Sequence, residues 1–168
     1  ADNGNGGQQG RAFIFFGGIT GTKRANADAD ADVIITGSTN SDRLGTAISS
    51  AGDFNGDGKY DVIIGVDRDD NNSLTDSGSA FIFFGGITGE KDPDTDADVI
   101  LNGQSASDRF GTSVASAGDF NGDGKDDVIV GASGDDNNSA GGSGSAFIFF
   151  GGITGTKRAD ADADVILD

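Results

Sequence analysis

Short apolar runs alternate with clusters of Gly, Asn, Asp and Ser along the whole chain. In its last third, four such runs follow one another, at residues 111–118, 128–131, 146–150 and 165–167. Turn-forming residues bound each run, and β-branched or aromatic residues fill most of them, which is typical of β-strands. No stretch keeps the 3.6-residue period of an amphipathic helix. We therefore expect an all-β chain with no helix longer than one turn.

The second and third of these runs are apolar at consecutive positions, which indicates a sheet covered on both faces. Four-stranded antiparallel sheets of this kind, repeated along a chain, are the blades of a β-propeller. The first run, 111–118, consists mainly of small residues, which suit the crowded place beside a propeller axis. A β-sandwich is the alternative, but it needs one solvated face on each sheet, so the pattern favours the propeller.

Internal repeats divide the chain. The string AFIFFGGITG begins at Ala12, Ala80 and Ala146. We interpret residues 37–102 and 103–168 as two full blades of four strands each. Residues 1–36 contain only a third and a fourth strand, so we interpret them as a partial blade. The chain then holds about two and a half of the four to eight blades that a closed propeller has.

Each full unit contains one Asp-rich loop, at residues 53–61 and 119–127. Oxygen-bearing side chains stand at positions 1, 3, 5 and 9 of both loops, and a glycine follows position 5, where the chain must turn sharply. Hard cations such as Ca²⁺ take six to eight oxygen ligands, so the sequence predicts about two calcium ions per chain. The candidate ligands are the side chains of Asp53, Asn55, Asp57, Asp61, Asp119, Asn121, Asp123 and Asp127, with the backbone carbonyls of Lys59 and Lys125 at position 7.

The spacing matches the first half of an EF-hand loop, but Ile64 and Val130 stand where the closing Glu would be. A strand rather than a helix therefore closes each loop. A turn of Gly, Asn and Asp without any metal is the alternative. The recurrence of all four side-chain positions favours calcium.

Alternating aspartates precede each expected fourth strand. If these segments are extended, a spacing of two residues places the carboxylates on one side. One interpretation is a second cation site. The other, which we favour, is that charge on an outer strand blocks edge-to-edge pairing. The residues are Asp28, Asp30, Asp32, Asp94, Asp96, Asp98, Asp160, Asp162 and Asp164.

The composition narrows the choice of partners. The formal net charge is −17 at pH 7, and Glu90 is the only glutamate. Such acidity argues against nucleic acid and anionic membranes as partners. No apolar run approaches the roughly 18 residues of a spanning helix, so we expect no membrane insertion. The start, at Ala1, lacks the pattern of a signal peptide, so a secreted form would have lost it or carry it outside this chain.

The segment 110–132, which begins Phe110-Gly111 and continues through the second Asp-rich loop, resembles an FG-GAP repeat, and 44–66 resembles it with Leu44 in place of the Phe. Such repeats form the propellers of integrin alpha chains and of many bacterial extracellular proteins. The resemblance implies that each calcium loop joins the first and second strands of a blade, that the eight Asp and Asn side chains are ligands, and that the protein is extracellular or on the cell surface. It also implies a ring of usually seven blades, which this chain is too short to form.

Three classes of function then compete. A calcium-rigidified structural or adhesive repeat agrees with the near-identical units, the acidity and the ion loops. A propeller module that binds a protein or glycan is the alternative, although near-identical loops argue weakly against one specialised pocket. An enzyme is not expected, because the chain has no His and no Cys for the usual nucleophile–base pairs.

The partial blade also predicts a partner. An isolated two-stranded hairpin is marginal in water, and this one carries Phe13, Phe15 and Phe16. Repeat arrays that lack caps expose apolar faces. We therefore expect identical or homologous repeats to cover the ends, either as neighbouring molecules or as further units of a longer array or filament.

Overall fold

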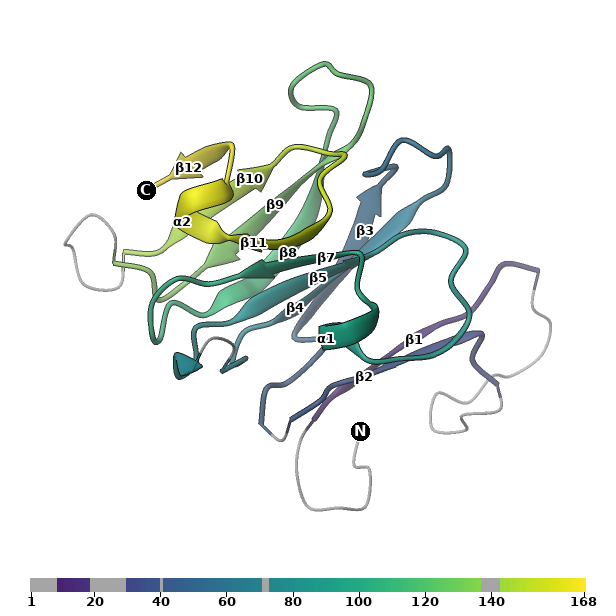
Figure 1. Cartoon of the computed structure of the whole chain (residues 1–168), viewed down its shortest axis with the longest axis horizontal. Coiled ribbons are helices and arrows are strands. Elements are labelled where there is room, and N and C mark those ends of the chain that lie inside the picture. Colours follow the sequence, from purple (N-terminus) through teal and green to yellow (C-terminus); the bar gives the residue numbers. More distant parts are fainter. Residues whose placement is uncertain (1–8, 19–29, 40, 71–72, 137–142) are drawn as a thin grey trace.

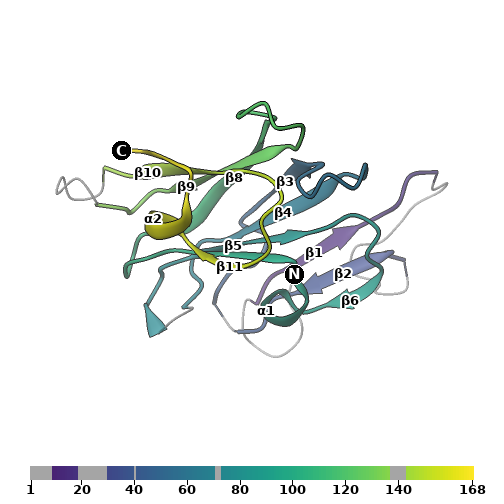
Figure 2. The ribbon, with the colours of Figure 1, turned by 45° about the horizontal axis from the view of Figure 1, so that its top comes forward.

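The computed structural model describes residues 9–18, 30–39, 41–70, 73–136 and 143–168 (Figure 1). Strands form nearly all of the regular structure, in three sheets that follow one another along the chain (Figure 2). The sheets do not close into a ring. The predicted all-β, propeller-like fold is confirmed.

The middle sheet shows how one blade is built. Its four antiparallel strands are β3 (Ala47–Gly52), β4 (Asp61–Val66), β5 (Ser79–Phe83) and β7 (Val99–Asn102), paired in that order. All four come from residues 37–102. Each strand therefore pairs with the next one in the sequence, and residues 53–60 and 67–78 connect the first three.

The third sheet repeats this order with β8 (Phe110–Gly118), β9 (Asp127–Ala132), β10 (Ser145–Phe149) and β12 (Val165–Leu167). From its own part of the chain, the first sheet has the described hairpin of β1 (Arg11–Ile14) and β2 (Val33–Thr36), which correspond to a third and a fourth strand. The four strand positions predicted within a unit are therefore present in both full blades.

Two short strands were missed by the sequence analysis. β6 (Gly89–Lys91) pairs in parallel with β2, and β11 (Gly155–Arg158) pairs in parallel with β7. Each therefore adds a strand to the sheet of the preceding blade, so the middle sheet has five strands in the order β11-β7-β5-β4-β3. The expectation that the fourth strand is an open edge protected by charge is wrong for β2 and β7. Their edges are covered, and backbone pairing joins consecutive blades.

The acidic runs before β7 and β12 are not extended. Pro93–Asp96 forms α1 and Ala159–Asp162 forms α2, each a single helical turn. Asp92 caps α1, because its side chain accepts a hydrogen bond from the backbone N–H of Asp94. The carboxylates therefore do not line up along one side of a strand, and this geometry removes the basis for a second cation site there. Asp28 lies outside the described residues.

The last aspartate of each run has a backbone role instead. The Oδ2 atom of Asp98 accepts a hydrogen bond from the N–H of Phe84 at 2.8 Å. The equivalent bonds join Asp164 to Phe150 at 2.7 Å and Asp32 to Phe16 at 2.8 Å. These carboxylates thus fix the backbone at the point where each Phe-rich strand ends.

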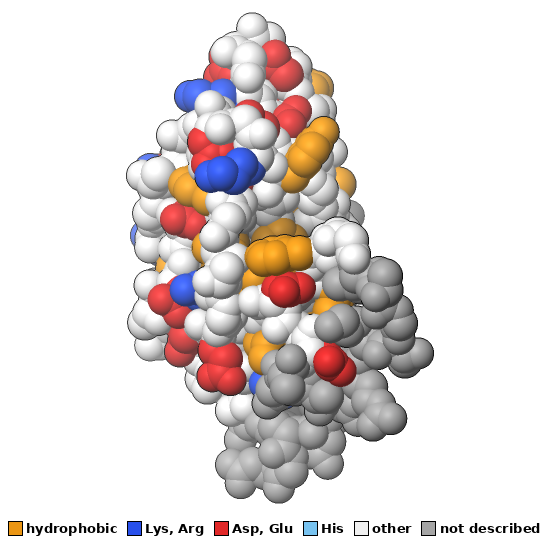
Figure 3. All heavy atoms as spheres, turned by 90° about the vertical axis from the view of Figure 1, so that its right-hand side faces the viewer, with side chains coloured by type: hydrophobic (Ala, Val, Ile, Leu, Met, Phe, Trp, Pro, Cys, Tyr) orange, Lys and Arg blue, Asp and Glu red, His pale blue; other side chains and the backbone are white. Residues whose placement is uncertain are grey.

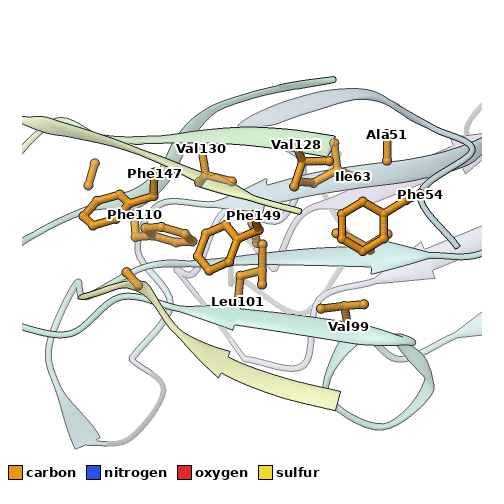
Figure 4. Close-up of a cluster of buried hydrophobic side chains, with 14 residues drawn as sticks. Ala51, Phe54, Ile63, Val99, Leu101, Phe110, Val128, Val130, Phe147 and Phe149 are labelled. Carbon is orange, nitrogen blue, oxygen red and sulfur yellow. The ribbon is translucent and has the colours of Figure 1, made fainter. Parts of the chain in front are cut away.

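The core lies between blades and involves both faces of β5. Phe81 and Phe83 pack against the first blade, in a cluster that includes Val33 and Ile35 of β2. Ala80 and Ile82 face the third blade, in a cluster with Phe147 and Phe149 of β10 (Figure 4). All five residues of β5 are buried. The Phe-rich strand of the middle blade is thus buried against the blade on each side, as the apolar pattern predicts.

Glycine allows the blades to approach closely. A Cβ atom on Gly65 of β4 would lie 2.0 Å from the carbonyl oxygen of Gly111, which belongs to β8 in the next blade. No side chain fits in that space. Phe110, just before this contact, is fully buried, and its ring lies 5.6 Å from that of Phe147 and 6.2 Å from that of Phe149, centroid to centroid.

Phe54 and Phe120 provide a matched pair for testing packing between blades. They occupy the same position in the two Asp-rich loops, but Phe54 is 0% exposed against the third blade and Phe120 is 60% exposed. We expect Phe54→Ala to lower the free energy of unfolding by about 3–5 kcal/mol. The same change at Phe120 should alter it by no more than about 0.5 kcal/mol. Urea unfolding measures both, and equal losses would contradict the packing described here.

Candidate functional site

The two Asp-rich loops lie at the same end of the two full blades. Loop 1, residues 53–61, joins β3 to β4, and loop 2, residues 119–127, joins β8 to β9. Gly56 and Gly58 have positive φ angles of 79° and 86°, so the turn of loop 1 requires glycine at these points. Their counterparts in loop 2 have φ angles of 80° and 92°. A strand follows each loop, as the sequence predicts.

In loop 1 the side-chain oxygens point inward, toward the backbone of the loop. Asn55 Oδ1 accepts a hydrogen bond from the N–H of Asp57 at 2.7 Å, and Asp57 Oδ1 accepts one from the N–H of Lys59 at 2.9 Å. Asp53 Oδ2 accepts a further bond from the N–H of Gly58 at 2.9 Å. The side chains of Asp53, Asn55 and Asp57 therefore belong to one hydrogen-bonded network within the loop. Lys59 contributes its N–H, and Asp61 accepts a bond from the N–H of Asn55.

Loop 2 repeats this arrangement. Asn121 Oδ1 accepts a hydrogen bond from the N–H of Asp123 at 2.8 Å, and Asp123 Oδ1 accepts one from the N–H of Lys125 at 2.9 Å. Both carboxylate oxygens of Asp119 also accept bonds from backbone N–H groups within the loop. The structure therefore brings together the predicted residues of loop 2 as it does those of loop 1.

The ninth residue anchors each loop to its blade. Asp61 and Asp127 are buried. One oxygen of Asp61 accepts a hydrogen bond from the N–H of Asn55 at 3.2 Å, and the other accepts one from Gly85 at 2.8 Å. Asp127 does the same for Asn121 and Gly151. Because Gly85 and Gly151 follow the Phe-rich strands, these carboxylates bind the loop to the third strand of its own blade.

The local environments shift the acidities of the loop carboxylates in opposite directions. Burial raises the pKa of Asp61, against the hydrogen bonds that it accepts. The pKa of Asp57 is lowered, first by the hydrogen bond from the N–H of Lys59, and the pKa of Asp123 is lowered in the same way by Lys125. Asp57 and Asp123 lie at the open side of their loops and keep their negative charge well below neutral pH.

The donor atoms of loop 1 are suited to a hard cation. All of its polar side-chain groups except the amide nitrogen of Asn55 and the ammonium of Lys59 are oxygens, and Asp53 Oδ1 is buried without any hydrogen-bond partner. Leaving a charged oxygen in that state is costly unless a cation or donor compensates it. Across the described ranges, no three carboxylates are already gathered around one point as a metal cluster. A bound cation would therefore need the Asn and backbone oxygens of the loop as well as its carboxylates.

A residue that the sequence analysis did not select connects the two loops. The backbone N–H of Asp53 donates to Asp126 Oδ2 at 2.7 Å, and the N–H of Asp126 donates to the carbonyl oxygen of Asp53 at 3.2 Å. The N–H of Gly152 donates to the carbonyl oxygen of Phe54 at 2.7 Å. Loop 1 is therefore held by the third blade. Tyr60 occupies the place of Asp126 in loop 1, so comparing the two repeats gives no sign of this role.

A second group of acids lies away from the loops. Asp42, Asp69 and Asp94 line a cavity of about 10 Å³ near Leu44. Burial, together with the charges of Asp70 and Asp94, raises the pKa of Asp42 from 3.8 to about 6. In the next blade the pKa of Asp108 is also raised, first by burial and then by Asp135 and Asp160. The sequence analysis missed this group because only the fold brings together residues that lie far apart in the sequence.

Comparison with known proteins identifies both loops as parts of one type of repeat. The family model described as "FG-GAP repeat" matches residues 44–83 and 110–149. Each matched segment begins at or just before the first strand and runs through the Asp-rich loop and the second strand to the end of the third strand. The resemblance stated from the sequence is therefore confirmed.

Curated relatives extend this similarity. The chain is 34% identical over 125 residues to the phosphatidylinositol-glycan-specific phospholipase D of Bos taurus, covering 73% of this chain and 14% of the relative. It is 36% identical over 87 residues to integrin alpha-5 of Xenopus laevis, covering 49% of this chain and 8% of the relative. It is 32% identical over 109 residues to integrin alpha-PS3 of Drosophila melanogaster, covering 64% of this chain and 9% of the relative. The chain thus spans less than a sixth of the length of these relatives.

Asp42 gives the chain a measurable dependence of stability on pH. In the unfolded chain its pKa returns to about 3.9. Because the pKa of Asp42 is higher in the folded chain, protonation of Asp42 contributes to the free energy of unfolding. This contribution is complete below the pKa of the unfolded chain and is lost as the pH rises through about 6. We therefore expect Asp42→Asn, in the presence of EDTA, to raise the free energy of unfolding at pH 7 by on the order of 1–3 kcal/mol and to reduce its change between pH 4 and pH 7.

The exposed Asp136→Asn variant is the matched control, since it removes one negative charge without changing a buried group. Urea unfolding of the native chain and both variants at several pH values makes the comparison. Identical pH profiles for the native chain and Asp42→Asn would contradict the assignment.

Proposed function

Because the chain is built from FG-GAP repeats arranged as propeller blades, we propose that it is a non-enzymatic, calcium-binding structural or adhesive module of an extracellular or cell-surface protein. One observation carries the proposal. Two loops in equivalent places present the same set of oxygen donors, and in loop 1 a buried carboxylate oxygen of Asp53 has no partner. A divalent cation supplies the missing charge there.

In this proposal each loop binds one Ca²⁺, about two per chain. The side-chain ligands of loop 1 are Asp53, Asn55, Asp57 and Asp61, and the carbonyl oxygen of Lys59 completes the set. Loop 2 uses Asp119, Asn121, Asp123, Asp127 and the carbonyl oxygen of Lys125. The ion draws the three carboxylates of the loop toward one point and neutralises their charge. It thereby rigidifies the loop that carries Phe54 into the next blade.

The partners that this architecture favours are like repeats. Each blade buries its Phe-rich strand only when another blade lies on each side, and the described blades do not form a ring. We propose that identical or homologous repeats continue the stack, as part of a longer array or filament. The net charge of −17 makes nucleic acid an unfavourable partner. In the described ranges no helix is long and apolar enough to cross a membrane.

Recognition of a protein or glycan ligand is the second candidate function. It is supported by the similarity to integrin alpha chains and to a phospholipase named as specific for phosphatidylinositol-glycan. The matched part is only 14% of that phospholipase, and this chain has no His or Cys, so we assign it a binding rather than a catalytic role. A ligand would then contact loops that are exposed on one end of the blades.

Calcium titration tests the main proposal. Isothermal calorimetry of the 168-residue chain should detect about two sites with dissociation constants of about 10⁻⁴ to 10⁻³ M. A site with a dissociation constant of about 0.1 mM would add about 2.7 kcal/mol to the free energy of unfolding at 10 mM Ca²⁺. Asp57→Ala should abolish one site and leave the other, and Asp123→Ala should do the reverse. The absence of any calcium uptake at millimolar concentrations would sink the proposal.

A further inference from the structure

A cavity of about 340 Å³ lies between the β1–β2 hairpin and the middle sheet, on the side of loop 1. Its walls are largely apolar: Ile14, Phe16 and Val33 contribute from the first blade, and Val62, Phe83 and Ile87 from the middle blade. Phe16 is 44% exposed and Tyr60, at the margin, is 81% exposed. Figure 3 shows the side of the molecule that carries this end of the sheets, with hydrophobic side chains gathered near its middle.

The corresponding region between the middle and the third blade is filled by side chains. Each wall residue has a counterpart 66 or 68 residues later, between the middle and the third blade. These counterparts are Ile82, Phe84, Val99, Val128, Phe149 and Ile153. All six belong to or pack against the cluster that completely buries Phe54 (Figure 4). The cavity therefore has the lining of a pocket for the phenylalanine of an Asp-rich loop.

The backbone around the cavity repeats the contacts of the filled pocket. The N–H of Gly152 donates to the carbonyl oxygen of Phe54, and a Cβ atom on Gly151 would lie 2.7 Å from that oxygen. Gly86 and Gly85 are the counterparts of these two glycines and line the cavity. They leave the same room for an incoming backbone and offer the same N–H donor.

The strand beside the cavity also lacks a neighbour that its counterparts have. β5 pairs with the second strand of its blade on one side and with the fourth on the other, and β10 does the same. Among the described strands, β1 pairs with β2, its fourth strand, and with no second strand. An edge of this kind is a template for an added strand. Because Ile14 of β1 lines the cavity, the cavity and this edge of β1 adjoin. We call this combined surface the footprint.

We propose that this footprint binds a β-hairpin of the type formed by β8, loop 2 and β9. One strand of the hairpin pairs with β1, and the phenylalanine at the second position of its loop fills the cavity. The proposal builds on the assembly with like repeats stated above and identifies the segment that makes the contact. The two hairpins of this kind within the chain are held in their own blades by β5 and β10, so the bound hairpin comes from a separate segment.

A synthetic peptide of residues 110–132 is the probe. The chain contains one tyrosine, Tyr60, and no tryptophan, whereas the peptide contains neither. Tyrosine fluorescence therefore reports directly on the margin of the cavity. We expect a saturable change on titration of the 168-residue chain with the peptide. The Phe120→Ala peptide should bind at least about tenfold more weakly, because Phe120 is the buried anchor of the contact.

A free peptide that is unstructured could fail to bind even if the footprint accepts a hairpin. A fusion of the hairpin segment to the chain therefore provides a second test. Residues 110–134 are placed directly before Ala1, which raises the effective concentration of the hairpin. The melting temperature should rise by several degrees relative to the unfused chain, and the same fusion with Phe120→Ala in the added segment should lose most of that gain. An unchanged melting temperature, or equal gains for both fusions, overturns the proposal.

Self-association of the chain is a further outcome that the titration can distinguish. If the chain alone self-associates with the same change in Tyr60 fluorescence, and the peptide does not compete, a second copy of the chain occupies the cavity and the proposal is overturned. Calcium uptake is measured on the chain without peptide. The calcium proposal and the hairpin proposal therefore fail independently of each other.

Discussion

Apolar packing between consecutive blades is the interaction on which the rest of the structure depends. A Phe-rich strand such as β5 carries large side chains on both faces, and one blade cannot bury both. Everything that joins the blades serves this burial. β6 and β11 cross to the preceding sheet, and Gly65 allows a strand of the next blade to approach. The stability of each blade is therefore linked to that of its neighbours.

The Asp-rich loops belong to the same system, because loop 1 contributes to the contact between blades. It carries Phe54 into the third blade, where Asp126 and Gly152 hold its backbone. Whatever orders the loop therefore also strengthens the packing. In the function proposed here, calcium acts on this link: it neutralises the carboxylates of the loop and fixes the position of the phenylalanine. Exposed Phe120 shows the same loop without a following blade.

The many aspartates of this chain do several different things, and their positions in the fold decide which. Some accept backbone hydrogen bonds where strands end, as Asp98 and Asp164 do. Others are candidate ligands, and Asp42 and Asp108 are buried near other acids, which together with burial raise their pKa values. Only the second group bears on ion binding. High acidity alone therefore does not measure the number of cation sites.

The sequence by itself determined the four strands of a blade, the two Asp-rich loops and the burial of β5 on both faces, because short-range periodicity, turn residues and repeat spacing are local signals. Only the tertiary structure decided that β6 and β11 are strands, since GEK and GTKR have no apolar pattern and pair through their backbones alone. The same holds for Asp126 and for the acids around Asp42. Their roles arise from contacts between residues that lie far apart in the sequence, and no local pattern encodes such contacts.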